Sequence, residues 1–202
     1  MSQAAAHDPA TLAFYDAECA AYAEREGKYG IPARLTGFLA HLKPGARILE
    51  LGCGGGRDAG AMIAAGFEVT PTDGSPGLAE EAERRLGVPV KVMRFDELRA
   101  EGEYDAVWAN ACLLHVPTEG LSGVLARIRT ALRPGGLFYA SYKAGDGAGR
   151  DALGRYHNFP TEAVLKAQYE AAGPWRRVDV ESGAGGGYDG VARTWLLVTA
   201  RR

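Results

Sequence analysis

The sequence lacks long apolar runs and an excess of charge of either sign. No run reaches the roughly eighteen consecutive apolar residues that a membrane-spanning helix requires. Its 23 lysine and arginine residues nearly balance 25 aspartate and glutamate residues, so no basic surface for nucleic acid is indicated. We therefore expect neither a membrane nor a nucleic acid as a partner.

Cysteine is also scarce. The three cysteines share no metal-ligand spacing with one another or with the four histidines, so we expect no metal site and no disulfide. The first ten residues, MSQAAAHDPA, lack the basic-then-apolar order of a secretory signal. The sequence thus predicts a cytoplasmic protein, which we expect to be a monomer or a homodimer.

Glycine is the residue that the chain has in abundance. Half of its 28 glycines gather in residues 52–60, 145–154 and 183–190, which we interpret as loops that face a ligand. A chain of 202 residues with 47% hydrophobic content has enough apolar material for one domain.

Alternating apolar segments predict an α/β fold. Strands are expected at residues 47–51, 68–72, 90–93, 105–109 and 137–143, and helices at residues 57–65, 76–86, 118–132 and 161–172. This order predicts a Rossmann-like, doubly wound, seven-stranded and mostly parallel sheet. The last two strands, at 175–182 and 195–200, have no helix between them, so they predict a hairpin that supplies one antiparallel edge strand.

Residues 1–44 precede this alternation and are interpreted as a helical lid or cap on the ligand-binding domain of residues 45–202. Helices are expected at residues 9–25 and 32–42. Tyr15 and Tyr22 fall on the buried stripe of the first helix. Packing is the simpler role for both, and contact with a substrate is the alternative.

Four segments follow strands, where doubly wound sheets bind their ligands. The first strand leads into Glu50-Leu-Gly-Cys-Gly-Gly-Gly56, in which glycines let main chain approach a ligand closely. Asp73 follows the second strand, where a carboxylate can bind ribose hydroxyls. Asp96 and Asn110 follow the third and fourth strands. Taken alone, the glycines also fit the looser G-x-G-x-x-A pattern of nicotinamide or flavin sites.

The complete pattern resembles the class I, Rossmann-like S-adenosylmethionine-dependent methyltransferases. The resemblance rests on E-x-G-x-G-x-G, the two aspartates, and the segments YDAVWANACLLHVP and LRPGGLFYAS. It is strong over residues 45–145. Within the family, GCGGGRDAGAMIAAGFEV is similar to the small-molecule and tellurite-resistance-like branch.

The resemblance implies S-adenosylmethionine as the methyl donor and a small molecule as the acceptor. The residues that it implies for cofactor binding are Glu50, Gly52, Cys53, Gly54, Gly56, Asp73, Gly74, Ser75, Phe95, Asp96 and Asn110. Among these, Asp96 would accept from the adenine amino group, or would instead cap a helix. Asp58 is better interpreted as stabilising a helix amino terminus.

Candidate acceptor residues lie after the fourth and fifth strands. His115 is a candidate general base because imidazole titrates near neutral pH, although it could equally belong to a packed turn with its ring bonded to main chain. The long loop at residues 143–160 supplies Arg150, Arg155 and Tyr156 as candidate substrate contacts. The alternative is a solvated loop with surface charges.

Three other functions compete with small-molecule methylation. A protein that binds S-adenosylmethionine without catalysis would keep the same motifs. A nicotinamide-dependent oxidoreductase would use the glycines but leaves Glu50 unexplained. A methyltransferase for proteins or nucleic acids is disfavoured because no basic stripe or recognition domain is present.

Overall fold

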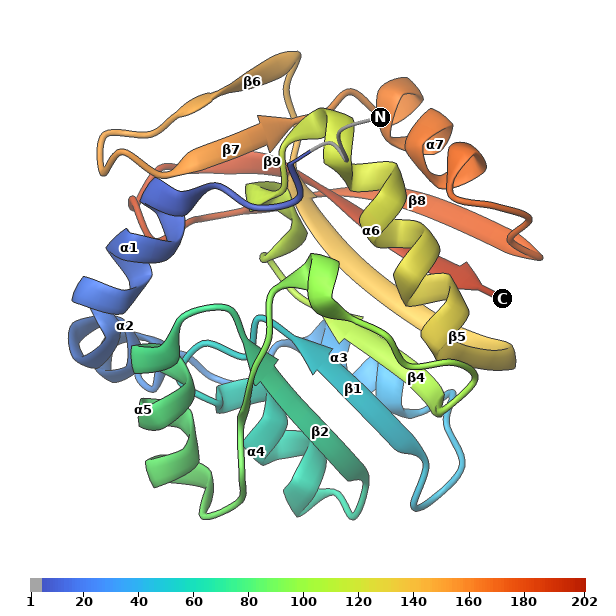
Figure 1. The fold of residues 1–202 in the computed structure, drawn as a ribbon, viewed down its shortest axis with the longest axis horizontal. Coiled ribbons are helices and arrows are strands. Elements are labelled where there is room, and N and C mark those ends of the chain that lie inside the picture. Colours follow the sequence, from blue (N-terminus) through green and yellow to red (C-terminus); the bar gives the residue numbers. More distant parts are fainter. Residues whose placement is uncertain (1–4) are drawn as a thin grey trace.

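A seven-stranded sheet forms the centre of the computed structural model, which describes residues 5–202 (Figure 1). In spatial order its strands are β3 (Lys91–Val92), β2 (Glu68–Asp73), β1 (Arg47–Leu51), β4 (Tyr104–Ala109), β5 (Leu132–Lys143), β9 (Arg193–Arg201) and β8 (Arg177–Gly185). The strand order reverses between β1 and β4, as in doubly wound folds. The predicted fold class is therefore confirmed.

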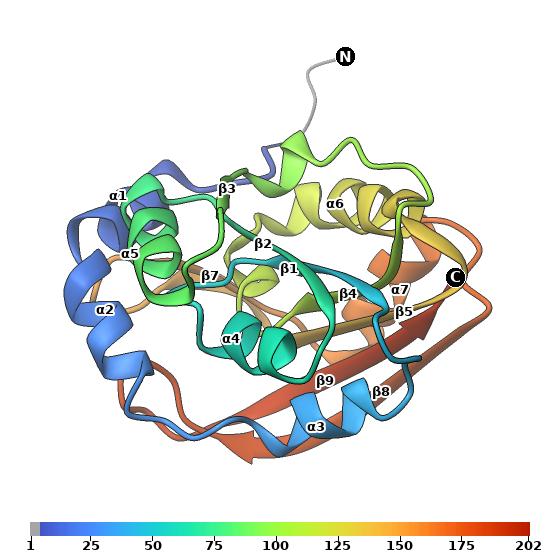
Figure 2. The ribbon, with the colours of Figure 1, turned by 90° about the horizontal axis from the view of Figure 1, so that it is seen from below.

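Helices cover both faces of this sheet (Figure 2). They are α1 (Pro9–Ala17), α2 (Cys19–Glu26), α3 (Ala33–Leu39), α4 (Arg57–Ala64), α5 (Pro76–Leu86), α6 (Thr118–Ala131) and α7 (Glu162–Ala171). Side chains alternate between two cores: Trp108 packs in one core with α3 and α4, whereas its neighbour Val107 packs in the other with α6 and α7. No helix in the described range has both the length and the apolar character to cross a membrane.

Local capping explains why several boundaries were predictable. The Ser75 hydroxyl accepts from the Leu78 amide at 3.1 Å, Pro76 takes the first helical position, and Gly87 closes α5 with a φ of 68°. Asp8 caps α1 in the same way by accepting from the Thr11 amide at 2.8 Å. Such signals are carried by neighbouring residues, so the sequence contains them in full.

The predicted helix at residues 9–25 is wrong in one respect. The chain leaves the helical conformation at Glu18, which has a φ of −100° and a ψ of 11°, and this break separates α1 from α2. The bend lets α1 and α2 each contact α5. An unbroken helix is straight and would follow a single direction. Residues 1–4 of the expected cap lie outside the described residues.

The carboxyl-terminal hairpin is present, but its antiparallel strand lies inside the sheet. Strand β9 runs antiparallel to both β5 and β8, and β8 forms the edge. Burial explains this order, because β9 buries Trp195, Leu196 and Val198 whereas no residue of β8 is buried. The apolar strand occupies the interior position and the polar strand the edge.

The segment that was expected to be a loop at residues 143–160 contains a second hairpin, β6 (Gly147–Arg150) with β7 (Tyr156–Phe159). Strand β7 is fixed to the turn after β4 by Asn158, whose amide nitrogen donates to the carbonyls of Leu113 and Val116 at 3.1 and 2.7 Å. The hairpin therefore stands beside the carboxyl end of β4. In Figure 1, α1 lies next to this hairpin.

Candidate functional site

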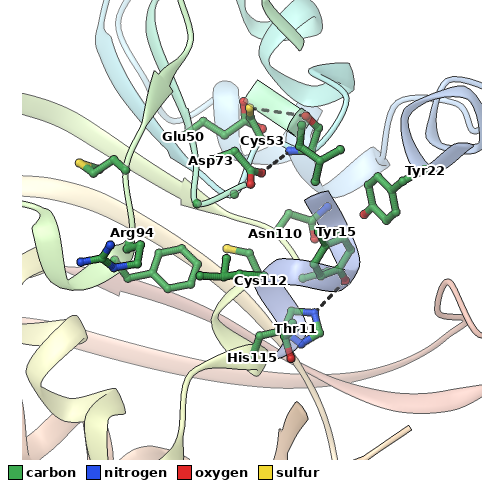
Figure 3. Close-up of a pocket in the computed structure, with 18 of the residues that line it drawn as sticks. Thr11, Tyr15, Tyr22, Glu50, Cys53, Asp73, Arg94, Asn110, Cys112 and His115 are labelled. Atoms are coloured by element: carbon green, nitrogen blue, oxygen red, sulfur yellow. Dashed lines mark hydrogen bonds between the residues drawn. The ribbon is translucent and has the colours of Figure 1, made fainter. Parts of the chain in front are cut away.

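Two adjoining cavities lie at the carboxyl ends of β1, β2 and β4. The inner cavity, of about 90 Å³, is bordered by the glycine turn after β1, and the outer cavity, of about 550 Å³, by the ends of β5 and β9. Seven residues line both cavities and so form their boundary: Tyr15, Tyr22, Glu26, Arg57, Asn110, Ala111 and His115. Figure 3 shows the inner cavity.

The turn after β1 has a shape that only glycine accommodates. Gly52 has a φ of 65°, and a Cβ atom added there would lie 2.5 Å from the Cβ of Cys112. A Cβ atom at Gly54 would lie 3.0 Å from a carboxylate oxygen of Glu26. Gly56, with a φ of 86°, begins α4. The main chain therefore forms the wall of the inner cavity here, as the glycine spacing predicted.

Asp73 joins this turn to the end of β2. One carboxylate oxygen accepts from the Gly54 amide at 3.0 Å and the other from the Ser75 amide at 2.9 Å. Burial raises the pKa of Asp73 from 3.8 to about 6, and the amides that it binds act in the opposite direction. Each oxygen retains a further lone pair for a ligand.

Carboxylates are concentrated around the inner cavity. Glu50 is 3% exposed, and one of its oxygens has no hydrogen-bond partner among the described residues. Burial, followed by the charges of Asp58 and Glu26, raises the pKa of Glu50 well above its ordinary value. Burial also raises the pKa of Glu26 from 4.5 to about 7. A cationic ligand would relieve the cost of ionising these groups.

The predicted cofactor residues occupy three kinds of position. Those that line the inner cavity are Glu50, Gly52, Cys53, Gly54, Asp73, Gly74, Phe95 and Asn110. Gly56 and Ser75 instead shape the starts of α4 and α5. Asp96 is not part of the cavity wall, because its carboxylate lies 3.4 Å from the Arg94 guanidinium. The wall there consists of Arg94 and Phe95.

His115 takes part in a chain of hydrogen bonds. Its Nδ1 lies 2.6 Å from the Tyr156 carbonyl, which can only accept, so Nδ1 carries the proton and donates. Its Nε2 therefore accepts from the Tyr15 hydroxyl at 2.9 Å, and that hydroxyl accepts from Arg155 at 2.9 Å. Burial, followed by His157, lowers the pKa of His115 to about 3. The imidazole is thus neutral at physiological pH.

The three substrate residues predicted from the hairpin segment differ in position. Arg155 is 2% exposed, lines the outer cavity and pairs with Asp151 at 2.6 Å. Arg150 and Tyr156 line neither cavity, contrary to the prediction. Arg150 pairs with Asp8 at 2.8 Å, and the Tyr156 amide donates to the Thr11 hydroxyl at 2.8 Å. These two residues connect the hairpin to α1.

Several wall residues were not predicted. Glu26 accepts from the Gly55 amide at 2.7 Å, although no motif marks the end of α2. Asp58, which the sequence predicts as a helix-terminus charge, also lines the inner cavity. It accepts from Trp108 Nε1 at 2.9 Å and from the side-chain nitrogen of Asn110 at 3.2 Å. In the outer cavity the unpredicted walls include Lys143, His157, Tyr188 and Trp195.

Comparison with known proteins identifies the central part of the chain. Residues 48–136 match the family described as Methyltransferase domain. The ubiquinone biosynthesis O-methyltransferase of Xanthomonas axonopodis pv. citri is 36% identical over 118 residues, which are 54% of this chain and 48% of that protein. The chain therefore spans about half the length of the curated relatives that it matches.

Solved structures extend the likeness to the whole chain. The 1,6-didemethyltoxoflavin-N1-methyltransferase of Burkholderia thailandensis, solved with 1,6-didemethyltoxoflavin and S-adenosylhomocysteine bound, has a TM-score of 0.72 and 27% identity. The match covers 100% of this chain and 92% of that one. An S-adenosylmethionine-dependent methyltransferase of Methanosarcina mazei has the same TM-score at 17% identity, covering 86% and 99% of the two chains.

These relatives are named for methyl transfer, and the sheet has the seven, mostly parallel strands expected from the sequence. None of the three relatives described above is named for tellurite resistance, so that narrower resemblance is not confirmed. The domain match and the glycine turn joined to Asp73 show that residues 48–136 resemble a methyltransferase domain, and the whole-chain structural likeness shows that the chain has the fold of class I S-adenosylmethionine-dependent methyltransferases.

Proposed function

We propose that this protein transfers the methyl group of S-adenosylmethionine to a small-molecule acceptor. The observation that carries the proposal is the hydrogen bond between Asp73 and the Gly54 amide, at a cavity walled by carboxylates. S-adenosylmethionine has a positively charged sulfonium and an ammonium group, which suit such a wall. The glycine cradle and the unpartnered oxygen of Glu50 also fit this donor.

Several residues of the inner cavity wall have a proposed role in holding the donor. Asp73 accepts from the ribose hydroxyls, and Glu50 with Glu26 faces the ammonium group. Gly52 and Gly54 present main chain to the methionine moiety, and Phe95 packs against the adenine. This assignment is supported by the fact that all of these residues line the same cavity.

The chemistry needs alignment more than a reactive side chain. When bound, S-adenosylmethionine supplies an electrophilic methyl carbon, which an acceptor atom attacks in line with the departing sulfur. Tyr15, Tyr22 and His115 line both cavities. We assign them to positioning the acceptor and excluding water from the reacting atoms.

The acceptor is proposed to be a small molecule that occupies the outer cavity, whose volume of about 550 Å³ lies within the range of small-molecule sites. Of the relatives named above, one is named for ubiquinone biosynthesis, and another was solved with the small molecule 1,6-didemethyltoxoflavin bound. A measurement of methyl transfer from S-adenosylmethionine to a small molecule would distinguish an enzyme from a protein that binds the donor without catalysis. The cytoplasmic location and the monomeric or homodimeric state stay predictions.

Residues 5–44 are proposed to act as the lid expected from the sequence. An inner cavity of about 90 Å³ is well below the several hundred Å³ typical of cofactor sites, and Tyr22 and Glu26 of α2 lie against the glycine turn. Outward movement of α1 and α2 would enlarge the inner cavity. In the closed arrangement, the ion pair between Arg150 and Asp8 would hold α1 against the β6–β7 hairpin.

Arg150→Met should loosen this lid. An exposed ion pair contributes up to about 1 kcal/mol, so we expect S-adenosylhomocysteine to dissociate roughly two- to fivefold faster. Stopped-flow displacement measures the rate. Arg177→Met, which removes an exposed pair with Asp179 on β8, is the matched control. Equal dissociation rates in the Arg150 variant and the unmodified protein would contradict the lid.

Asp73→Asn should weaken S-adenosylhomocysteine binding by about tenfold or more, because hydrogen bonds to a charged group contribute about 1.5–3 kcal/mol. The asparagine has nearly the same size, but its single acceptor oxygen can replace Asp73 at only one of the two amides, so a loosened turn contributes to the loss of affinity. Isothermal titration calorimetry measures the affinity, and Asp105→Asn, remote from both cavities, serves as the control. Unchanged affinity in Asp73→Asn would remove the ribose assignment.

The carboxylates should make stability depend on pH. Glu26 and Asp73 have folded-state pKa values of about 7 and about 6, above their ordinary 4.5 and 3.8. Between about pH 5 and pH 7 the folded state binds more protons at these sites than the unfolded state does, so these groups lower the free energy of unfolding as pH rises. In Glu26→Gln the free energy of unfolding should therefore fall less steeply between about pH 5 and pH 7.

Cationic S-adenosylmethionine should compensate for the ionised carboxylates. We therefore expect the rise in Tm that it produces to be larger at pH 8 than at pH 5, and Glu26→Gln to reduce that difference. Thermal unfolding at both pH values with saturating donor measures it. An equal rise in Tm at the two pH values would show that these carboxylates do not face the donor's positive charge.

His115 is proposed to act on the acceptor through Tyr15, by accepting a hydrogen bond from the Tyr15 hydroxyl at Nε2. A base with a pKa of about 3 takes up little proton at neutral pH, so His115 is poorly suited to general base catalysis. NMR should show its imidazole resonances unchanged from pH 5 to pH 8, with the proton on Nδ1. His115→Gln identifies the resonances by their loss. A midpoint between pH 6 and pH 7 would restore His115 as a general base.

A further inference from the structure

The outer cavity contains two buried donors that the proposed methyl transfer does not use. Lys143 at the end of β5 and Trp195 on β9 are direct partners in the antiparallel ladder, so their side chains project from the same face of the sheet. Both line the outer cavity and neither lines the inner one. The register of two strands has therefore placed these two side chains next to each other on one face of the sheet, at the wall of the outer cavity.

Neither donor is fully satisfied by the protein. Trp195 is 6% exposed, and its Nε1, which can only donate, has no acceptor among residues 5–202. The Lys143 side chain is 3% exposed, and its Nζ lies 3.5 Å from Asp189, a carboxylate that also lies 3.4 Å from Arg193. Burial is the main cause that lowers the pKa of Lys143. An anion beside both donors would complete their hydrogen bonding.

The main chain packs closely around these donors and, in the part of the chain that the structure describes, brings no acceptor side chain to them apart from Asp189. A Cβ atom at Gly185 would lie 2.8 Å from the Trp195 ring, and one at Gly187 would lie 3.0 Å from Lys143 Nζ. The glycine-rich connection between β8 and β9 therefore packs directly against the pair. Asp151, near the same cavity, is already engaged by Arg155 and His157 at 2.6 and 3.1 Å.

The outer cavity wall also carries aromatic and cationic side chains. The rings of Tyr22 and Tyr188 lie 5.1 Å apart, Tyr15 lies 5.2 Å from Tyr22, and Arg34 and Arg155 contribute guanidinium groups. Such rings pack well against a flat aromatic ligand. The wall thus favours a planar molecule that carries negative charge.

We propose that Lys143 and Trp195 form an anion subsite that binds the acid group of an aromatic acceptor, either a carboxylate or a phosphate. This inference rests on the proposed function and names the acceptor class. The acid group is held at the β5–β9 end of the outer cavity, which leaves the remainder of the molecule to extend toward the boundary with the inner cavity. The selected acceptor is a ring that bears both an acid and a nucleophilic atom.

Binding to the protein saturated with S-adenosylhomocysteine tests this subsite. The probes are hydroxybenzoates, hydroxyphenylacetates and hydroxycinnamates, each compared with its neutral carboxamide, together with hydroxyphenyl phosphates. We expect at least one acid to bind about tenfold more tightly than its amide, since hydrogen bonds to ionised groups are roughly twice as strong as neutral ones. The carboxylate and phosphate series distinguish the two acid groups.

Two variants locate the preference. Lys143→Met should remove it, and Trp195→Phe, which keeps an aromatic ring but loses the N–H, should reduce it several-fold. The NMR signal of the Trp195 indole proton, identified by its loss in Trp195→Phe, should shift when the acid binds and not when the amide binds. Lys166→Met, on the exposed side of α7, should leave the preference unchanged.

The inference is overturned if no acid binds more tightly than its amide, if the preference survives Lys143→Met, or if Trp195→Phe leaves the preference unreduced. Because Lys143 is buried, a failure of Lys143→Met to fold leaves the decision to Trp195→Phe and to the indole signal. Affinity for S-adenosylhomocysteine, measured separately, reports on the proposed function. If the protein binds S-adenosylhomocysteine but binds no acid more tightly than its amide, the subsite is rejected and the proposed function is not.

Discussion

The hydrogen bond from the Gly54 amide to Asp73 is the constraint on which the site depends. It fixes the turn after β1 to the end of β2, two segments that lie side by side only because their strands are parallel neighbours. The same carboxylate accepts from the Ser75 amide at the start of α5. One buried side chain therefore sets the position of three cavity walls, and its raised pKa reflects the burial that this role requires.

A second constraint holds the other side of the site. Arg155 pairs with Asp151, donates to the Tyr15 hydroxyl and lies about 5 Å from the ring centroids of Phe14 and Tyr188. Helix α1, the β6–β7 hairpin and the β8–β9 connection thus meet around one guanidinium group. The wall of the outer cavity depends on this meeting point, because Tyr15 in turn bonds to His115.

The two cavities differ in charge. Carboxylates dominate the inner cavity, whereas arginine, lysine and neutral histidine side chains dominate the outer one. A cationic donor and an anionic acceptor would each meet a complementary wall, which would also disfavour binding in the reversed order. A nicotinamide dinucleotide, whose pyrophosphate is anionic, is a poor match for the inner carboxylates, in agreement with the methyltransferase relatives.

The alternation of strands and helices in the central sheet, the glycine turn and the acid that follows β2 could all be predicted from the sequence. These features depend on side-chain periodicity, on capping and on the φ angles that glycine permits, all of which act between near neighbours. Three contacts could be seen only in the folded chain. Glu26 accepts from the Gly55 amide, Tyr15 bonds to His115 100 residues away, and Lys143 lies opposite Trp195. Those contacts depend on strand register and on how α1 and α2 pack, and residues distant in sequence carry no local signal of either.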